Sequence, residues 1–215
     1  MYQKIIEELK KLSEPEFAAW LRPFLSLTVE SEDIILGIRV PFLRKKAFEY
    51  KNLDIFTLQK LLQSEYHEAR ELALFIMLLK SKKEPQLMCD LYLNNLKYIN
   101  NWDLIDYTAP HIVAPFVSEK KLKELAESNY MWTNRVAMVS TIYLIKKNDY
   151  KLALELAEKF ITHPHHLMHK AAGWMLREIG KRDRQVLLDF LQKFSFTMPA
   201  IMKSYAKEKL RKKSC

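Results

Sequence analysis

Three segments of the chain follow one pattern: His67-Glu68-Ala69-Arg70-Glu71-Leu72-Ala73-Leu74, Thr133-Asn134-Arg135-Val136-Ala137-Met138-Val139 and Leu167-Met168-His169-Lys170-Ala171-Ala172-Gly173-Trp174. Each opens with polar residues, carries a cation and then turns apolar. Arg135 and Lys170 lie 35 positions apart, and Arg70 lies about two such periods before Arg135. A repeat of roughly 30 to 35 residues is typical of proteins built from stacked helical pairs.

The segments between these repeats supply the second helix of each pair. Residues 152–160 and 186–191 place leucine and other apolar side chains at three-to-four spacing, which indicates amphipathic helices. Each pair then buries its apolar face on its neighbours, and the small twist from pair to pair curves the stack into a concave surface. The sequence therefore predicts an all-α fold.

Glycine is scarce, with three residues among 215. Phosphate-binding loops of the Walker and dinucleotide types need several glycines at fixed offsets, and Gly37, Gly173 and Gly180 match neither pattern. The strand-like pieces, Thr28-Val29 and residues 33–38, are too short to assign by periodicity, and we expect them to be a connector.

The charge of the chain favours an anionic partner. Lys and Arg number 35 against 26 Asp and Glu, which gives a formal charge of +9. The cysteines, Cys89 and Cys215, offer no disulfide framework and no zinc-ligand spacing. The first ten residues alternate charged and apolar groups, unlike a signal peptide or a membrane span. We expect one cytoplasmic domain over residues 1–215, with no membrane association.

The repeated cations define a candidate nucleic-acid surface. If the helices that carry them line the concave surface, Arg70, Arg135 and Lys170 fall at intervals along one groove, as contacts to a sugar-phosphate backbone would. Alternatively, each cation caps its own helix or extends into water. The recurrence of the pattern favours the groove.

Asn100-Asn101-Trp102-Asp103-Leu104-Ile105-Asp106 carries the strongest indication of chemistry. Trp102 and Asp106 are four residues apart and therefore share a helix face. Two carboxylates and an indole in an apolar segment are costly to bury without partners, so the segment needs a structural partner or a positively charged ligand. Pro110 should end or bend the helix soon afterwards.

That segment, followed by residues 132–141 and by 169–183, resembles the AlkD-type DNA alkylation repair proteins from about Gly37 to Leu210. The resemblance implies a right-handed superhelical solenoid of HEAT-like repeats with a concave DNA-binding groove. It also implies a monofunctional glycosylase of base excision repair that hydrolyses N3- and N7-alkylated purine nucleotides in duplex DNA without flipping the base into a pocket. We expect a monomer that needs neither a metal nor a small-molecule cofactor.

The resemblance also assigns roles to residues. Asp106 would be the catalytic carboxylate, Trp102 and Trp174 would flank the deoxyribose, and Arg135 would hold the adjacent phosphate. Further DNA contacts are expected from polar and basic residues of the same blocks and of the preceding helix: Arg44, Lys45, Arg70, Asn101, Asn134, His169, Lys170 and Lys181. Trp20 and Trp132 are interpreted as ordinary packing residues.

Three alternatives remain beside this interpretation. The family often carries arginine at the positions of Ala200 and Ser204, and the match before residue 37 is weak, so a non-catalytic DNA-binding module is the main rival. A helical-repeat adaptor for an acidic peptide is a second. The four histidines within residues 163–169 could bind a metal, but an exposed turn explains them as well.

Overall fold

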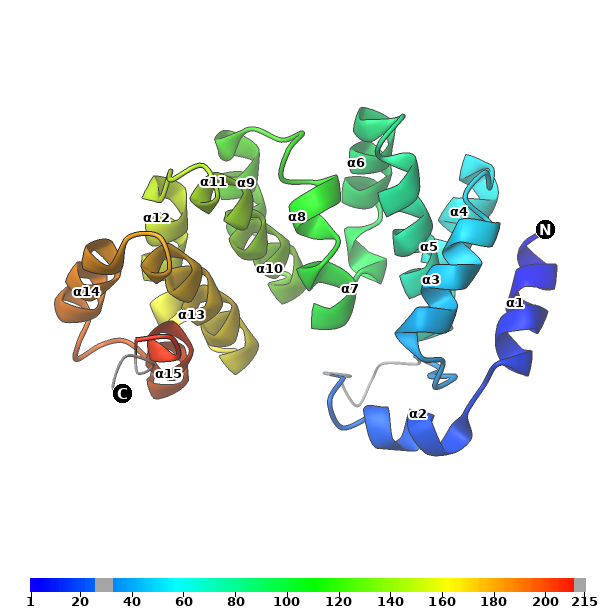
Figure 1. The fold of residues 1–215 in the computed structure, drawn as a ribbon, viewed down its shortest axis with the longest axis horizontal. Coiled ribbons are helices and arrows are strands. Elements are labelled where there is room, and N and C mark those ends of the chain that lie inside the picture. Colours follow the sequence, from blue (N-terminus) through cyan, green and yellow to red (C-terminus); the bar gives the residue numbers. More distant parts are fainter. Residues whose placement is uncertain (26–32, 211–215) are drawn as a thin grey trace. The chain divides into compact units, whose positions relative to one another are not determined.

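The computed structural model describes residues 1–25 and 33–210. Its regular elements are helices (Figure 1). They are α1 Tyr2–Lys11, α2 Pro15–Leu21, α3 Val40–Glu49, α4 Ile55–Leu62, α5 His67–Lys80, α6 Pro85–Asn94, the 3-10 helix η1 Leu96–Tyr98, α7 Trp102–Asp106, α8 Ala109–Ile112, α9 Glu119–Ala126, α10 Met131–Ser140, α11 Ile142–Ile145, α12 Lys151–Lys159, the 3-10 helix η2 Phe160–Thr162, α13 His166–Gly180, α14 Arg184–Lys193 and α15 Ala200–Lys207. The prediction of an all-α fold is confirmed.

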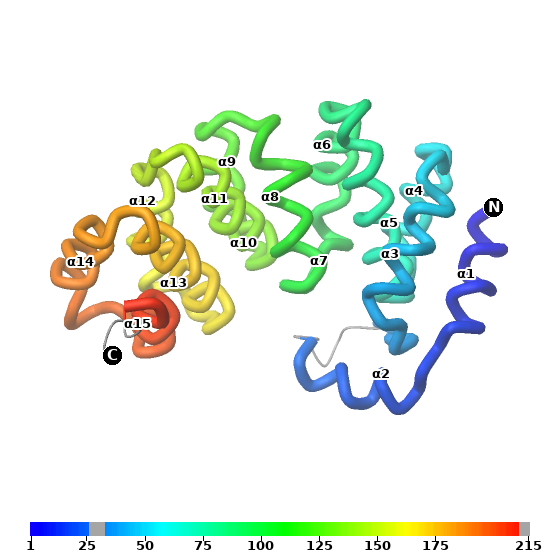
Figure 2. Tube along the Cα trace, viewed as in Figure 1, coloured from blue at the N-terminus to red at the C-terminus, as the bar shows by residue number. Residues whose placement is uncertain are grey.

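The chain divides into two compact units, Met1–Phe116 and Val117–Cys215. In the first unit, α5 packs against α1, α3, α4, α6, α7 and α8. It is buried on every side through its first three turns, from His67 to Met77. Figure 2 traces the first unit from α1 in blue to α8 in green.

The second unit is built around α10 and α13. The α10 helix is buried from Trp132 to Ser140 and packs on α9, and α13 packs on α10, α12, α14 and α15. These helices contain the second and third copies of the sequence repeat, and α12 and α14 lie where second helices were predicted. Among the described residues, no helix is long and apolar enough to cross a membrane.

The connector before α3 is held by α5. Ile34 forms an isolated parallel bridge with Tyr66, so residues 33–38 are a connector as predicted, whereas Thr28-Val29 lies outside the described residues. The buried Glu68 carboxylate accepts hydrogen bonds from the backbone N–H groups of residues 36–38. Gly37 has φ +77°, and a Cβ there would collide with the backbone of α2.

The two tryptophans that were interpreted as packing residues differ. Trp132 is buried, in agreement with that interpretation. Trp20 is 58% exposed and stacks between Phe17 and Phe24, with ring centroids 5.4 and 4.8 Å away, so the interpretation was wrong for Trp20. The reason is that α2 buries none of its residues.

Candidate active site in the first unit

The short helix α7 positions the predicted catalytic segment. Asn101 caps its N-terminus by accepting a hydrogen bond from the Trp102 backbone N–H at 2.9 Å. Leu104 and Ile105 are fully buried, which directs the opposite face, with Trp102 and Asp106, outward from the core. The helix ends at Asp106, and Pro110 lies in the first turn of α8, where its missing N–H costs nothing. The prediction for Pro110 is confirmed.

Trp102 and Asp106 line one cavity of about 600 Å³ whose walls are mainly apolar. The indole Nε1 of Trp102 donates a 2.9 Å hydrogen bond to the Phe24 carbonyl, which fixes the ring plane against the segment that follows α2. The α2 side chains Phe17 and Leu21 and the adjacent Leu25 contribute apolar wall. The arrangement combines a fixed aromatic face with a carboxylate in one open cavity.

A cation borders the same cavity. The Arg44 guanidinium of α3 lies over the rings of Phe75 and Tyr107, at 4.5 and 4.8 Å from their centroids. Stacking between two rings holds the exposed side chain in place while leaving its N–H groups able to bind an anion. Arg44 therefore remains a predicted DNA contact, as does its exposed neighbour Lys45.

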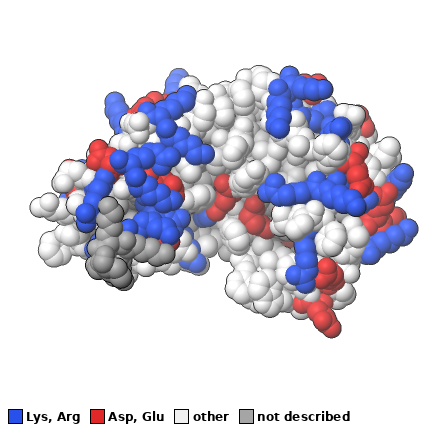
Figure 3. Space-filling view, viewed as in Figure 1, with Lys and Arg blue, Asp and Glu red and all other residues white. Residues whose placement is uncertain are grey.

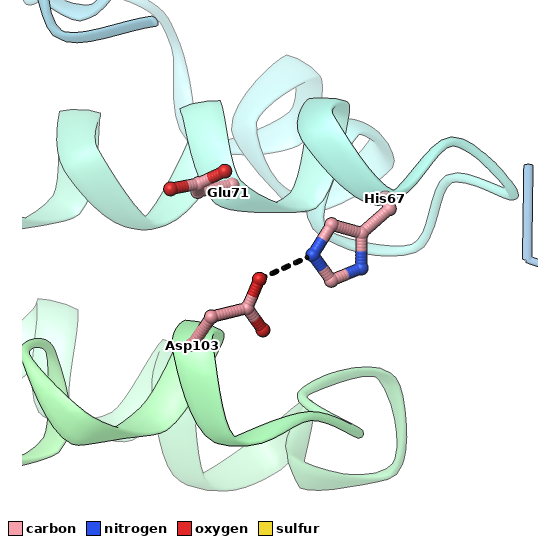
Figure 4. A group of neighbouring side chains, drawn as sticks. All are labelled: His67, Glu71 and Asp103. Carbon is pink, nitrogen blue, oxygen red and sulfur yellow. Dashed lines mark hydrogen bonds and ion pairs between the residues drawn. The ribbon is translucent and has the colours of Figure 1, made fainter. Parts of the chain in front are cut away.

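The cavity is also lined by titratable groups to which no role was assigned from the sequence. The His67 Nε2 atom lies 2.7 Å from the Asp103 carboxylate (Figure 4). Burial lowers the pKa of His67, but the Asp103 carboxylate outweighs that effect and raises it above its ordinary value. Burial, reinforced by the charge of Asp103, raises the pKa of Glu71 to about 8. The available sequence signal was the four-residue spacing of His67 and Glu71, the same spacing as Trp102 and Asp106.

Three residues that were predicted to contact DNA are buried and bonded to other parts of the protein. Arg70 is 3% exposed and forms an ion pair with Asp33 at 2.5 Å. Asn101 caps α7 through its side-chain oxygen, while its buried amide nitrogen has no hydrogen-bond partner among the described residues. Asn134 donates to the carbonyls of residues 125, 126 and 128 and so ties α10 to the end of α9. Most of their polar groups therefore already have internal partners, and their contacts with DNA stay predictions.

The other predicted residues of the second unit lie on or beside α10 and α13. Arg135 is 5% exposed and donates a 2.7 Å hydrogen bond to the Leu167 carbonyl at the start of α13. Trp174 is half-buried, and its Nε1 donates to Glu178 at 3.3 Å. The proposed contacts of Arg135 and Trp174 with DNA stay predictions.

Basic and imidazole groups of α13 complete the predicted set. Lys170 is half-buried, and Lys181 forms an ion pair with Glu178 at 2.5 Å. Burial lowers the pKa of His169 below its ordinary value. On the face shown in Figure 3, Lys and Arg side chains lie over both units. Their DNA contacts also stay predictions.

The histidine-rich turn before α13 has a local structural role. The Nδ1 atom of His163 accepts a hydrogen bond from the His165 backbone, and the Nδ1 atom of His165 accepts one from Leu167 and caps α13. Among the residues that the structure describes, the three-residue group with metal-ligand atoms close together is instead His67, Glu71 and Asp103. That group was not predicted from the sequence.

Comparison with known proteins assigns the chain to a family. The family model described as DNA alkylation repair enzyme matches residues 5–210. A comparison with curated protein sequences gave no match.

Solved structures share the fold at low sequence identity. A predicted DNA alkylation repair enzyme from Enterococcus faecalis is 17% identical, with a TM-score of 0.68 over 93% of this chain and 97% of that one. AlkD2 from Streptococcus mutans is 18% identical, with a TM-score of 0.59 over 90% of this chain and 97% of its own. With the family model covering nearly the whole sequence, the chain belongs to the DNA alkylation repair enzyme family.

Proposed function

We propose that this protein is a monofunctional DNA glycosylase that hydrolyses the N-glycosidic bond of cationic N3- and N7-alkylated purine nucleotides in duplex DNA. The observation that carries the proposal is that Trp102 and Asp106 share one cavity in the first unit. Membership of the alkylation repair family and the charge of +9 support a DNA substrate. The proposal includes a monomer acting in the cytoplasm.

The chemistry of the substrate explains why one carboxylate is enough. A purine alkylated at N3 or N7 is already cationic and leaves as a neutral base, so the reaction needs no general acid. Positive charge develops on the deoxyribose as the glycosidic bond lengthens. A carboxylate stabilises that charge electrostatically, and an indole face stabilises it through the ring quadrupole.

In this mechanism Asp106 has two roles. Its carboxylate stabilises the sugar cation and positions the water that attacks the anomeric carbon. Trp102, fixed by its hydrogen bond to Phe24, presents its ring to the sugar. The further roles of Trp174 and Arg135, beside the deoxyribose and at the phosphate, follow from the family resemblance.

The base can stay stacked in the duplex in this mechanism. Lability of the cationic lesion, rather than contacts to base edges, would then provide the selectivity. The Asp103 carboxylate beside Asp106 supports this view, because negative charge in the cavity favours a positively charged substrate over a neutral one.

The test measures release of 7-methylguanine and 3-methyladenine from alkylated duplex DNA. We expect release by the wild type and a loss of at least about 100-fold in Asp106→Asn, the scale of removing one electrostatic contribution to the transition state. Asp90→Asn is the matched control, because Asp90 is an exposed carboxylate on α6 of the same unit. Both variants must bind DNA as the wild type does.

Two results would overturn the proposal. If the folded wild type binds duplex DNA and releases no base, the protein is a non-catalytic DNA-binding module. If it binds an acidic peptide and no DNA, it is an adaptor. Equal loss of activity in both aspartate variants would show that Asp106 has no special role.

A further inference from the structure

The cavity beside the proposed catalytic pair contains a second cluster with a different chemistry. His67 and Glu71 lie one turn apart on α5, and Asp103 lies on α7 across from them (Figure 4). One ligand atom from each residue, an imidazole nitrogen or a carboxylate oxygen, lies within 4.8 Å of the other two. Two rigid helices therefore bring one nitrogen donor and two oxygen donors together.

Glu71 has no folding role that explains its burial. It is 9% exposed and lines the cavity, yet its carboxylate makes no hydrogen bond to any of the described residues. Burying an ionised carboxylate without a partner costs free energy, and most buried carboxylates accept hydrogen bonds from other groups of the protein. A ligand in the cavity would remove that cost.

Glu68 on the same helix provides the contrast. It is buried even more deeply than Glu71, but its carboxylate accepts three backbone hydrogen bonds and holds the connector before α3. The two glutamates differ in what they face. Both line the cavity, but the Glu68 carboxylate faces the backbone N–H groups that donate to it, whereas Glu71 lies beside Asp103 and His67.

We propose that His67, Glu71 and Asp103 bind one divalent transition-metal ion, with Zn²⁺ as the preferred ion. One imidazole and two carboxylates are a donor set that Zn²⁺ accepts, and two carboxylate charges balance the charge of the ion. Ligand atoms around tetrahedral zinc lie roughly 3.3–3.6 Å apart, given bonds of about 2.0–2.2 Å. The three ligand atoms lie within 4.8 Å of one another, and His67 Nε2 and the Asp103 carboxylate, now 2.7 Å apart, would separate to that spacing as the ion replaces their hydrogen bond. The cavity leaves the fourth position open to water.

Metal binding at this cluster has a consequence for the proposed reaction. A cation in the cavity opposes the positive charge that develops on the deoxyribose beside Asp106. Zn²⁺ should therefore inhibit base release. This consequence rests on the proposed function, whereas the metal site itself is tested without DNA, so failure of one leaves the other to be judged separately.

The test measures Zn²⁺ binding to the full-length protein by equilibrium dialysis after removal of metals with EDTA. We expect one equivalent to bind to the wild type and the affinity to fall at least tenfold in Glu71→Gln, with Asp103→Asn as a second variant in case the first is poorly folded. The visible spectrum of bound Co²⁺ reports the coordination geometry. Far-ultraviolet circular dichroism checks that each variant is folded.

The control addresses the other candidate ligands of the chain. His166 is exposed and belongs to the histidine-rich turn, so His166→Ala should leave Zn²⁺ affinity unchanged. Loss of binding in His166→Ala with retention in Glu71→Gln would assign the metal to that turn and overturn the proposal. Absence of Zn²⁺ binding to the wild type would also overturn it.

Discussion

Replacement of Gly173 by alanine tests the packing that positions the helix of Trp174. Gly173 lies in the middle of α13, where α15 crosses it. A Cβ at this position would lie 2.6 Å from the Met202 carbonyl oxygen and 2.7 Å from the Tyr205 Cβ. Ordinary contacts begin near 3.4 Å, so α15 must retreat by about 0.8 Å.

The expected cost follows from that displacement. A gap of 0.5–1 Å forfeits about a quarter to a half of the dispersion attraction along the interface. Met202 and Ala206, both fully buried on α15, would lose contact with α13. Overpacking of this kind costs about 1–3 kcal/mol, while alanine in place of glycine in a helix recovers about 1 kcal/mol. We expect a net destabilisation of up to roughly 2 kcal/mol.

Gly180→Ala is the matched control on the same helix. Its added Cβ would meet the Leu187 side chain, whose outer methyl groups can rotate, instead of a backbone carbonyl. Its cost and the gain in helix propensity should nearly cancel. Urea denaturation followed by tryptophan fluorescence measures both variants. A Gly173→Ala variant that is as stable as Gly180→Ala, or more stable than the wild type, would contradict this prediction.

Three further predictions concern the first unit's anchors and the DNA surface. Glu68→Gln should lower the free energy of unfolding by about 3 kcal/mol, because one amide oxygen replaces a carboxylate that accepts three backbone hydrogen bonds. Urea denaturation measures this free energy, and a loss below about 1 kcal/mol would contradict the prediction. Asp33→Asn should cost about 3–5 kcal/mol at pH 7, since it leaves the Arg70 charge buried without its carboxylate. Burial raises the pKa of Asp33, but hydrogen bonding and the charge of Arg70 outweigh burial and lower the pKa below 3.8. The stabilisation by the ion pair is therefore present above that pH and is lost as the pH falls. The difference in unfolding free energy between wild type and variant should shrink in acid, and a constant difference would count against the ion pair. Ser204→Arg should tighten binding to duplex DNA and steepen its salt dependence by about one unit of slope, as measured by fluorescence anisotropy, with the opposite effect on affinity for Ser204→Glu; no change in either would remove α15 from the DNA surface.

The helical repeat could be predicted because its signal is local. The cores of α5, α10 and α13 come from apolar side chains at three-to-four spacing, and that spacing is present in the sequence whatever the helices pack against. The end of α7 was also predictable, because Pro110 restricts its own backbone.

The hydrogen-bond and ion-pair partners of the polar residues on those helices could not be predicted in the same way. Arg70 was expected in a groove because its position repeats, yet its partner is Asp33, which comes from the connector before α3. Asn134 resembles a surface residue in sequence, but its side-chain amide donates hydrogen bonds to three backbone carbonyls at the end of α9. Such pairings depend on contacts between segments distant in the chain, which a single sequence does not reveal.

The cavity shows why half of the candidate site was predictable and half was not. Trp102 and Asp106 belong to one short helix, so their spacing alone placed them on one face. His67 and Glu71 show the same spacing, but their meaning depends on Asp103, which the packing of α5 on α7 brings to them. The packing of these two helices therefore surrounds the proposed catalytic carboxylate with further acidic groups. That arrangement favours cations of two kinds, a charged lesion and a metal ion, and competition between them would be the direct sign that both bind in this cavity.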